Sequence, residues 1–409
     1  MNQPSAVTQS HFFPNHAIAI IALAQLFGTS LWFSANSAVL DLMDKWKLST
    51  ADIGWLTNAV QAGFILGTFL IAFTGLADRF KASSIFVCAA LAGALFNLCF
   101  AWVAHGLFHA MIYRFLVGIC LAGIYPIGMK LVVQWAPEQA GQALAKLVAM
   151  LTLGTALPYV VNGLSTHLAW QAVMTCSSIL AIFAAALIFK LGDKNLVIPV
   201  TKAQRYADTF QVFKIAKFRA AAIGYFGHMW ELYAFWTIIP LFLVKSDIPE
   251  RLGLNNIALF TFLVMACGGI GCLFNGYLSK RIGSANAAIG ALAISGISCC
   301  IFALSWRVLP AWLLLLILAI WGASVIADSP QFSALSAQAC PPEKLGTALA
   351  IQNSIGFAIT IFSITLITYA FELIGLDAAW ILLIGPILGI VGFYTTDRSS
   401  PTIPKEIKS

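Results

Sequence analysis

Ionisable side chains within long apolar stretches are the residues of this sequence whose types and spacing could do chemistry. Glu231 follows His228 by three positions in one stretch, about 18 Å deep if helical, and Asp328 precedes a Ser-Pro pair in another. A charge near the centre of a bilayer costs a few kcal/mol, so such residues are functional candidates. A buried carboxyl escapes that cost by taking up a proton. We therefore predict proton-coupling roles for Glu231, His228 and Asp328, with a structural hydrogen bond as the alternative for each carboxyl.

Two cations in the apolar stretch 107–134 could hold an anion. Arg114 lies about 10 Å from one end of a helix there. Its guanidinium keeps its charge and needs an acid, a carbonyl cluster or an anionic substrate. A clamp between helices is the alternative for Arg114. Lys130 lies near the other end, where its ammonium could instead reach the headgroup region. Both interpretations remain open for each cation.

Uncharged polar and aromatic side chains recur at helical spacing and would line a polar cavity. Gln25, Thr29, Trp32 and Asn36, for example, follow one another by four, three and four positions. Each such stripe could also be ordinary packing between helices, but their recurrence favours a polar substrate. The predicted substrate-binding residues are Arg114, Tyr125, Lys130, Gln25, Thr29, Trp32, Asn36, Tyr159, Trp230, Tyr233 and Asn353.

Length and composition indicate which elements hold these side chains. Of the 409 residues, 60% are hydrophobic and 10% are charged, whereas a soluble domain has roughly a quarter charged residues. A membrane-spanning helix needs about 20 apolar residues, and long uninterrupted apolar runs are unlike the alternating strands of a β-barrel. The net charge of +7 comes without a basic face, so no nucleic-acid partner is expected. We predict an all-α, polytopic membrane protein with 12 transmembrane helices.

An internal repeat divides the predicted helices into two parallel sets of six. The pattern that runs from Pro126 to Leu144 returns from Pro330, at an offset of 204, with one inserted residue. Two such repeats are typical of transporters whose halves are related by an axis along the membrane normal. Residues 1–190 would form the N-terminal bundle, 191–218 a cytoplasmic linker, and 219–409 the C-terminal bundle with a short cytoplasmic tail.

The distribution of Lys and Arg predicts that both termini are cytoplasmic. In that orientation 15 of them lie on the cytoplasmic side and five on the other, in accord with the positive-inside rule. The linker residues 204–218 could form an amphipathic helix on the inner leaflet or a solvated connection. The expected location is the bacterial inner (plasma) membrane.

Several motifs resemble those of the major facilitator superfamily. The turn Thr74 to Lys81 is similar to that family's Gly-x-x-x-Asp-Arg-x-Gly loop, with Asp78 and Arg79 matching. Arg114 with Gly118 resembles its intramembrane Arg-x-x-x-Gly motif. The segments 227–233 and 328–333 resemble a bacterial branch often grouped with nitrate/nitrite carriers. Spans 54–76 and 256–279 contain neither Lys nor Arg, so that group's arginines have no counterpart here.

The resemblance implies alternating access with a cytoplasmic gate. Arg79 would pair with Glu138, and Arg281 with Glu343. Asp78 would cap a helix of the other half, where a helix N-terminus attracts a carboxylate. Such bonds would hold one access state and break in the other.

These observations predict a secondary active transporter, proton-coupled, for a small polar solute, with an organic anion or zwitterion favoured. Proton-driven efflux of drugs or toxic metabolites is the alternative, and a transporter-like membrane sensor is the alternative of another class. No catalytic or metal motif is found, so we expect no enzyme, no cofactor and no metal. The expected partners of this monomer are the substrate, a proton (with sodium left open) and the bilayer. A Glu231→Gln variant would lose pH-driven transport and keep some exchange.

Overall fold

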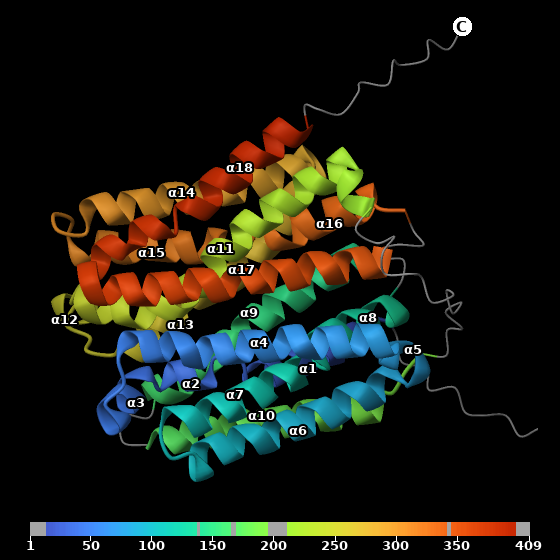
Figure 1. The fold of residues 1–409 in the computed structure, drawn as a ribbon, viewed down its shortest axis with the longest axis horizontal. Coiled ribbons are helices and arrows are strands. Elements are labelled where there is room, and N and C mark those ends of the chain that lie inside the picture. Colours follow the sequence, from blue (N-terminus) through green and yellow to red (C-terminus); the bar gives the residue numbers. More distant parts are fainter. Residues whose placement is uncertain (1–13, 137–139, 165–168, 195–210, 342–344, 398–409) are drawn as a thin grey trace, which may run out of the picture.

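The computed structural model describes residues 14–136, 140–164, 169–194, 211–341 and 345–397, and within these ranges it contains helices and no strand (Figure 1). Nine helical segments of the described chain are long and apolar enough to cross a membrane. The predicted all-α membrane fold is therefore confirmed. The count of 12 spans stays a prediction.

The first half of the chain, residues 14–194, is called the N-half below. Its fourth helix starts at a capping box, in which the Ser49 side chain and the Asp52 carboxylate each accept a backbone N–H of the other residue. Pro126 lies in the first turn of α8, just after the break that ends α7. The helices are α1 (Pro14–Thr29), α2 (Ser34–Ser37), α3 (Val39–Trp46), α4 (Thr50–Thr74), α5 (Leu76–Arg79), α6 (Ala82–Val103), α7 (Leu107–Ala122), α8 (Tyr125–Trp135), α9 (Ala140–Leu164) and α10 (Trp170–Leu191).

Residues 211–397, the C-half, repeat this arrangement. A break between α15 and α16 places Pro330 in the first turn of α16, as Pro126 is placed in α8. Proline is tolerated there because the first N–H groups of a helix have no partner within it. The elements are α11 (Ala216–Lys245), α12 (Ile248–Arg251), α13 (Ile257–Ile282), α14 (Ser284–Ser305), α15 (Ala311–Ser324), α16 (Ser329–Ala339), α17 (Leu345–Ile374), the 3-10 helix η4 (Gly375–Ile381) and α18 (Ile384–Asp397).

A close helix crossing recurs in both halves. A Cβ atom on Gly118 would collide with the carbonyl oxygen of Val60, where α7 crosses α4, and one on Gly322 with that of Val264, where α15 crosses α13. Both residues of the second pair lie 204 positions after those of the first, the offset of the sequence repeat. Glycine lets helix backbones approach closely in a membrane. The domain boundaries at 190 and 219 stay predictions.

Gly118→Val and Gly322→Val should each destabilise the fold. The added side chain meets backbone, which cannot swing aside, so we expect a loss of at least about 1–3 kcal/mol, as for overpacked cores. Thermal unfolding in detergent measures this loss. Gly290→Val is the control, because a Cβ at Gly290 meets nothing within 4 Å apart from its own stretch of helix. Equal melting temperatures for all three variants would contradict the prediction.

The halves meet along two helix pairs, α4 with α17 and α9 with α13. Figure 1 shows α4 beside α17 over much of their length. Asn58 Nδ2 donates to Thr365 Oγ1 at 2.8 Å, and Asn256 Nδ2 donates to the carbonyl oxygen of Gly163 at 2.7 Å. The second bond lies toward the end of the molecule that carries α3 and α12, called the α3 end below. The opposite end carries α5, α8 and α16 and is called the α5 end.

The end of the predicted linker packs on the C-half. Val212 is 1% exposed and belongs to a cluster with Phe218, Ala222, Cys340 and Ala348. Residues 204–210 lie outside the described chain. The contacts of 211–215 favour an anchored connection over a free helix on the membrane surface.

Candidate functional site

His228 of α11 and Asp328, the residue before α16, form a buried pair. Nδ1 of His228 lies 2.7 Å from Oδ1 of Asp328, and the side chains are 1% and 0% exposed. Asp328 stands at the break between α15 and α16, where backbone groups are released from helical bonding. Nε2 of His228 has no hydrogen-bond partner in the described structure. The pair can share a proton and still offer one imidazole nitrogen to another molecule.

Aromatic rings of both halves stack with one another. The ring centroid of Trp32, in the N-half, lies 5.6 Å from that of Tyr233 and 5.9 Å from that of Phe357, both in the C-half. Phe64 of α4 lies 4.4 Å from Phe357, and Tyr125 lies 6.5 Å from Trp32. This aromatic cluster brings together three of the predicted substrate-binding residues, Trp32, Tyr125 and Tyr233.

Tyr225 links the aromatic cluster to the buried pair. Its ring centroid lies 5.7 Å from that of His228. Its side chain also packs on α17, where a Cβ added to Gly356 would come within 2.7 Å of it. The residue after Gly356 is Phe357, a member of the aromatic cluster. The pair and the cluster are thus neighbours along the contact of α11 with α17.

Glu231 lies inside the C-half and has two partners there. Its Oε2 accepts a hydrogen bond from Ser295 Oγ of α14, and its Oε1 accepts one from Trp321 Nε1 of α15, both at 2.6 Å. Glu231 is 0% exposed. The structure therefore pairs His228 with Asp328 and lets Glu231 join three helices of the C-half. This geometry supports the structural alternative for Glu231.

Arg114 is fully buried among carbonyl and side-chain oxygens of the N-half. It donates to the carbonyl oxygens of Leu31, at 3.1 Å, and of Trp32, and to Ser34 Oγ at 3.2 Å and Asn97 Oδ1 at 3.3 Å. These groups belong to the segment around the break between α1 and α2 and to α6. Of the two interpretations of Arg114, the contacts support the clamp between helices.

Lys130 reaches the α5 end of the molecule. Its Nζ donates to the carbonyl oxygen of Ala77 in α5. This bond supports the interpretation in which the side chain extends out of the apolar region, and it leaves substrate binding by Lys130 as a prediction.

The predicted gate is only partly within the described chain. Arg281 donates to the hydroxyl of Tyr277 at 2.5 Å and stacks on its ring, and Arg79 is exposed. Glu138, Glu343 and the side chain of Asp78 lie outside the described residues. The pairs Arg79–Glu138 and Arg281–Glu343 stay predictions.

Two uncharged candidates are buried without hydrogen-bond partners in the described structure. The amide of Gln25 is 0% exposed and the hydroxyl-bearing side chain of Tyr159 is 1% exposed. A buried polar group without a partner costs about 1–3 kcal/mol. Both groups are therefore available to a bound solute or water.

The other uncharged candidates bond within the protein or are half-buried. Thr29 Oγ1 donates to a carbonyl of its own helix at 2.8 Å. Asn36 Nδ2 donates to Thr57 Oγ1 at 2.8 Å, and Trp230 Nε1 donates to the carbonyl oxygen of Ile381 at 2.9 Å. Asn353 is half-buried on α17. Binding by these four residues stays a prediction.

Sequence reasoning missed two buried glutamines. Both amide atoms of Gln352 and Nε2 of Gln61 have no hydrogen-bond partner in the described chain, and Gln61 Oε1 accepts from Trp32 Nε1 at 3.2 Å. Gln61 follows Thr57 by four positions, and Gln352 precedes Gly356 by four. Helical spacing was the signal that could have found them.

A cavity of about 230 Å³ lies at the α3 end, between the halves. Asp41, Tyr159, Asn162 and Asn256 line it. Burial raises the pKa of Asp41, with a smaller contribution from a neighbouring acid. Tyr159 thus faces a cavity at the α3 end whose lining mixes polar and apolar side chains.

Comparison with known proteins shows the family. The model of the Major Facilitator Superfamily matches residues 20–364. The niacin transporter NiaP of Acinetobacter baylyi is 26% identical over 297 residues, which are 62% of this chain and 65% of that relative. The chain therefore spans slightly less than two thirds of that protein's length.

Two solved structures have the same fold. One is a bacterial homologue of the human lysosomal transporter Spinster in an inward-facing, unoccupied conformation. It matches with a TM-score of 0.69 at 13% identity, and the match covers 95% of this chain and 98% of that one. The nucleoside transporter NupG, in a mutant form, has a TM-score of 0.71 at 14% identity, covering 93% and 99%. All three relatives are transporters, in agreement with the expectation of a transporter and no enzyme. The match over most of the chain confirms what its motifs predicted: this protein belongs to the Major Facilitator Superfamily.

Proposed function

We propose that the protein is a proton-coupled secondary transporter that moves a small polar solute by alternating access. The observation that carries this proposal is the contact of 2.7 Å between His228 and Asp328, fully buried beside the aromatic cluster. With one proton the pair is neutral overall, and without it the pair carries one negative charge. A buried uncompensated charge is costly, so release of the proton is linked to a change at the site.

A substrate anion fits this arrangement better than a cation. Arg114 and Lys130 are engaged by carbonyl oxygens, which leaves His228 as the cationic group nearest the aromatic cluster among these candidates. When the pair holds its proton as imidazolium and carboxylate, Nε2–H of His228 can donate to a substrate carboxylate. Anion and proton then enter the site together, so that their joint binding adds no net charge to it.

The uncharged surroundings favour a flat, ring-bearing anion. Trp32, Tyr233 and Phe357 offer ring faces, and aromatic pairs prefer offset or edge contacts at centroid distances of about 4.5–7 Å. The amides of Gln25 and Gln352 supply donors without partners. Niacin, which the relative NiaP is named for, is a pyridine ring with one carboxyl group and has this chemistry.

Uptake of labelled niacin into proteoliposomes with an imposed pH gradient tests the proposal. We expect uptake that rises when the outside is acidic and that a protonophore abolishes. Nicotinamide is the matched control ligand, because it keeps the ring and lacks the carboxylate. A thermal-shift screen of other organic anions and zwitterions at two pH values extends the test to the rest of the substrate class. Ligand-dependent transport that follows a sodium gradient and ignores pH would contradict proton coupling.

Efflux of a drug or toxic metabolite is the second candidate. The aromatic cluster favours it, because stacked rings also bind large apolar compounds. A deletion strain separates the two functions. Sensitivity to toxic compounds supports efflux, whereas poor growth on a limiting organic anion supports uptake.

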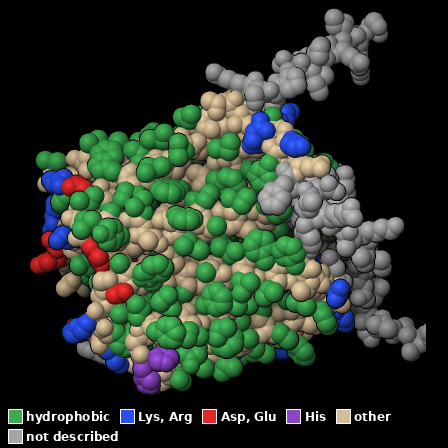
Figure 2. Space-filling view, in the orientation of Figure 1, with side chains coloured by type: hydrophobic (Ala, Val, Ile, Leu, Met, Phe, Trp, Pro, Cys, Tyr) green, Lys and Arg blue, Asp and Glu red, His purple; other side chains and the backbone are tan. Residues whose placement is uncertain are grey.

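We also propose that the protein is a monomer in a bacterial inner membrane with the α5 end facing the cytoplasm. Lys81, Lys280 and Arg281 lie at that end. On the face shown in Figure 2, Lys and Arg are visible at the α5 end without acidic side chains, whereas the opposite end carries both basic and acidic side chains. At the α3 end Arg307 donates to Asp377 at 2.5 Å. Charges of both signs at the α3 end and an excess of Lys and Arg at the α5 end fit the positive-inside rule.

A further inference from the structure

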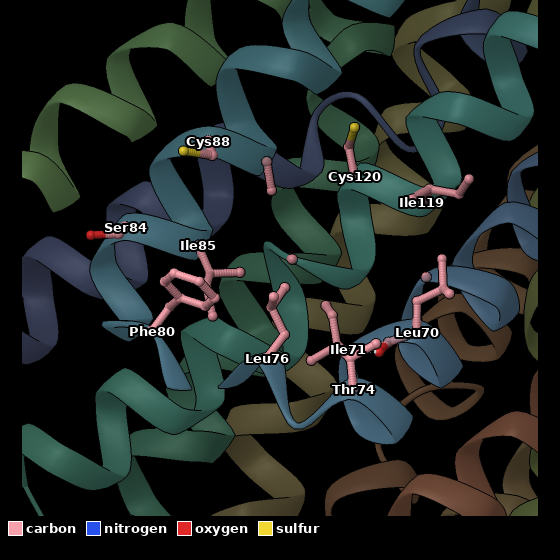
Figure 3. Close-up of a pocket in the computed structure, with 13 residues that line it drawn as sticks. Leu70, Ile71, Thr74, Leu76, Phe80, Ser84, Ile85, Cys88, Ile119 and Cys120 are labelled. Atoms are coloured by element: carbon pink, nitrogen blue, oxygen red, sulfur yellow. Dashed lines mark hydrogen bonds between the residues drawn. The ribbon is translucent and has the colours of Figure 1, made fainter. Parts of the chain in front are cut away.

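A crevice of about 620 Å³ opens in the N-half between α4, α6 and α7, next to α5 (Figure 3). Its walls are apolar and include Leu70, Ile71, Ile85 and Ile119. The crevice is accessible from the outer surface of the bundle, where Leu70 is 48% and Phe80 is 59% exposed. It lies away from the contact between the halves and has no part in the site described above.

Close helix contacts bound the crevice on its inner side. A Cβ on Gly67 would come within 2.7 Å of the carbonyl oxygen of Ile119, which fixes α4 against α7. A Cβ on Gly123 would come within 2.5 Å of the Cβ of Ala89, which fixes the end of α7 against α6.

The C-half has an amide at the corresponding position, and this amide links neighbouring helices. Asn275 corresponds to Ile71 by the offset of 204, and its Nδ2 donates to the carbonyl oxygens of Ala327, at 2.8 Å, and Ala287, at 3.3 Å. Ala327 corresponds to Gly123 by the same offset. One asparagine thus joins α13, α14 and the break after α15. In the N-half Ile71 cannot form these bonds, and the space stays open and apolar.

Basic side chains stand at the α5 end of the crevice. Arg79 and Lys81 are exposed and flank Phe80, which lines the crevice. Asp193 lies against the start of α6. Its carboxylate accepts hydrogen bonds from the backbone N–H of Ala82, at 3.0 Å, and from the hydroxyl of Ser83. An apolar slot on the membrane-facing surface with two cations at its end matches the chemistry of an acyl chain attached to an anionic headgroup.

We propose that the crevice binds one acyl chain of an anionic phospholipid, with the headgroup beside Arg79 and Lys81. Hydrocarbon, not water, surrounds this part of a membrane-spanning fold, so a lipid chain is the molecule available to fill it. The proposal places the site in the N-half, where Ile71 cannot form the bonds that Asn275 forms in the C-half.

Photo-crosslinking of the purified protein in nanodiscs tests the site. The probe is phosphatidylglycerol with a diazirine on one acyl chain, and labelled peptides are mapped by mass spectrometry. We expect labels concentrated in residues 67–89 and 119–123, several-fold above the corresponding peptides 271–291 and 323–327. Equal labelling of the two halves would overturn the proposal.

Two variants change the crevice in different ways. Cys88→Phe places a ring at its rim. Ile71→Asn introduces a polar amide that can link the helices as Asn275 does in the C-half; both should reduce labelling several-fold. Gly290→Phe is the matched control. Gly290 corresponds to Cys88, because α6 and α14 both have 22 residues and start 202 positions apart. Full labelling in a correctly folded Cys88→Phe protein, judged by its melting temperature, would overturn the acyl-chain site.

The headgroup is tested separately. Unlabelled phosphatidylglycerol should compete with the probe better than phosphatidylcholine, and the double variant Arg79→Gln, Lys81→Gln should remove this preference. Equal competition by the two lipids against the unaltered protein would overturn the anionic headgroup and leave a site for acyl chains of any lipid.

Discussion

Replacement of Asp328 by Asn is expected to reduce proton-driven uptake strongly while leaving exchange of substrate across the membrane. The amide has the size of the carboxyl but cannot take up and release a proton. It also removes the charge that His228 Nδ1 contacts at 2.7 Å. Hydrogen bonds to charged groups contribute about 1.5–3 kcal/mol, which corresponds to a loss of roughly 10- to 100-fold in coupled rate. Uptake under a pH gradient and counterflow without one, both in proteoliposomes, measure the two activities.

Glu231→Gln is the matched control, because it makes the same chemical change at another fully buried carboxyl. Oε1 of Gln can still accept the hydrogen bond of Trp321, and its Nε2 can donate to Ser295 Oγ in place of the bond that Ser295 now donates. We therefore expect coupled uptake to persist in Glu231→Gln, which revises the expectation drawn from sequence. Loss of coupling in Glu231→Gln together with its retention in Asp328→Asn would return the proton site to Glu231.

A double variant asks whether His228 and Asp328 act as one unit. His228→Gln alone should also lose coupling, and the two changes together should cost little more than either one. Such non-additivity is the signature of residues in direct contact. Strictly additive losses would mean that the two side chains serve separate steps.

The fold could be predicted from the sequence because membrane helices are specified by composition and by repeats. A chain with 10% charged residues has few ways to satisfy its backbone other than helices in a bilayer. Pro126 and Pro330 are 204 positions apart, and the glycine contacts at Gly118 and Gly322 are separated by the same offset. These are local features, and a single sequence contains them in full.

The partners of the buried charges could not be predicted in the same way. The cost of a buried charge identified Glu231 and Arg114, but Ser295 and Trp321 lie 64 and 90 positions from Glu231. Arg114 bonds to the backbone carbonyls of Leu31 and Trp32, and every residue has a carbonyl. Sequence therefore reveals that a charge needs a partner without revealing which half supplies it.

The crevice of the N-half is lined by a residue that differs from its aligned counterpart in the C-half. Ile71 and Asn275 occupy the same place in the repeat, and each is an ordinary residue of a membrane helix. The consequence of the exchange appears only when Ala287 and Ala327 are placed next to Asn275. A repeat predicts shared architecture, and the departures from it mark where the halves have separate roles.

Replacement of Arg114 by Met is expected to destabilise the N-half severely. Arg114 donates to two backbone carbonyls, to Ser34 and to Asn97, and it is 0% exposed. Methionine fills much of the volume but donates to none of these oxygens. Ser34 Oγ also donates to the carbonyl oxygen of Leu31 and to Asn97 Oδ1, but it has a single proton to share between them. A buried acceptor left without a donor costs about 1–3 kcal/mol, so several of them together cost a large part of the stability of a typical domain. The yield of folded protein and its melting temperature in detergent measure the loss.

Lys130→Met and Arg114→Lys separate the clamp from an anion site. Lys130 lies in the same predicted span and reaches the α5 end, so its replacement should change the melting temperature far less than that of Arg114. Arg114→Lys keeps the charge, but a single ammonium cannot span the carbonyls of Leu31 and Trp32 and the side chain of Asn97 together, because only the guanidinium donates in a fixed fork. We therefore expect Arg114→Lys to be destabilised as well. If Arg114→Lys instead melts like the unaltered protein and loses affinity for the substrate anion alone, Arg114 binds substrate in another access state and the clamp is secondary.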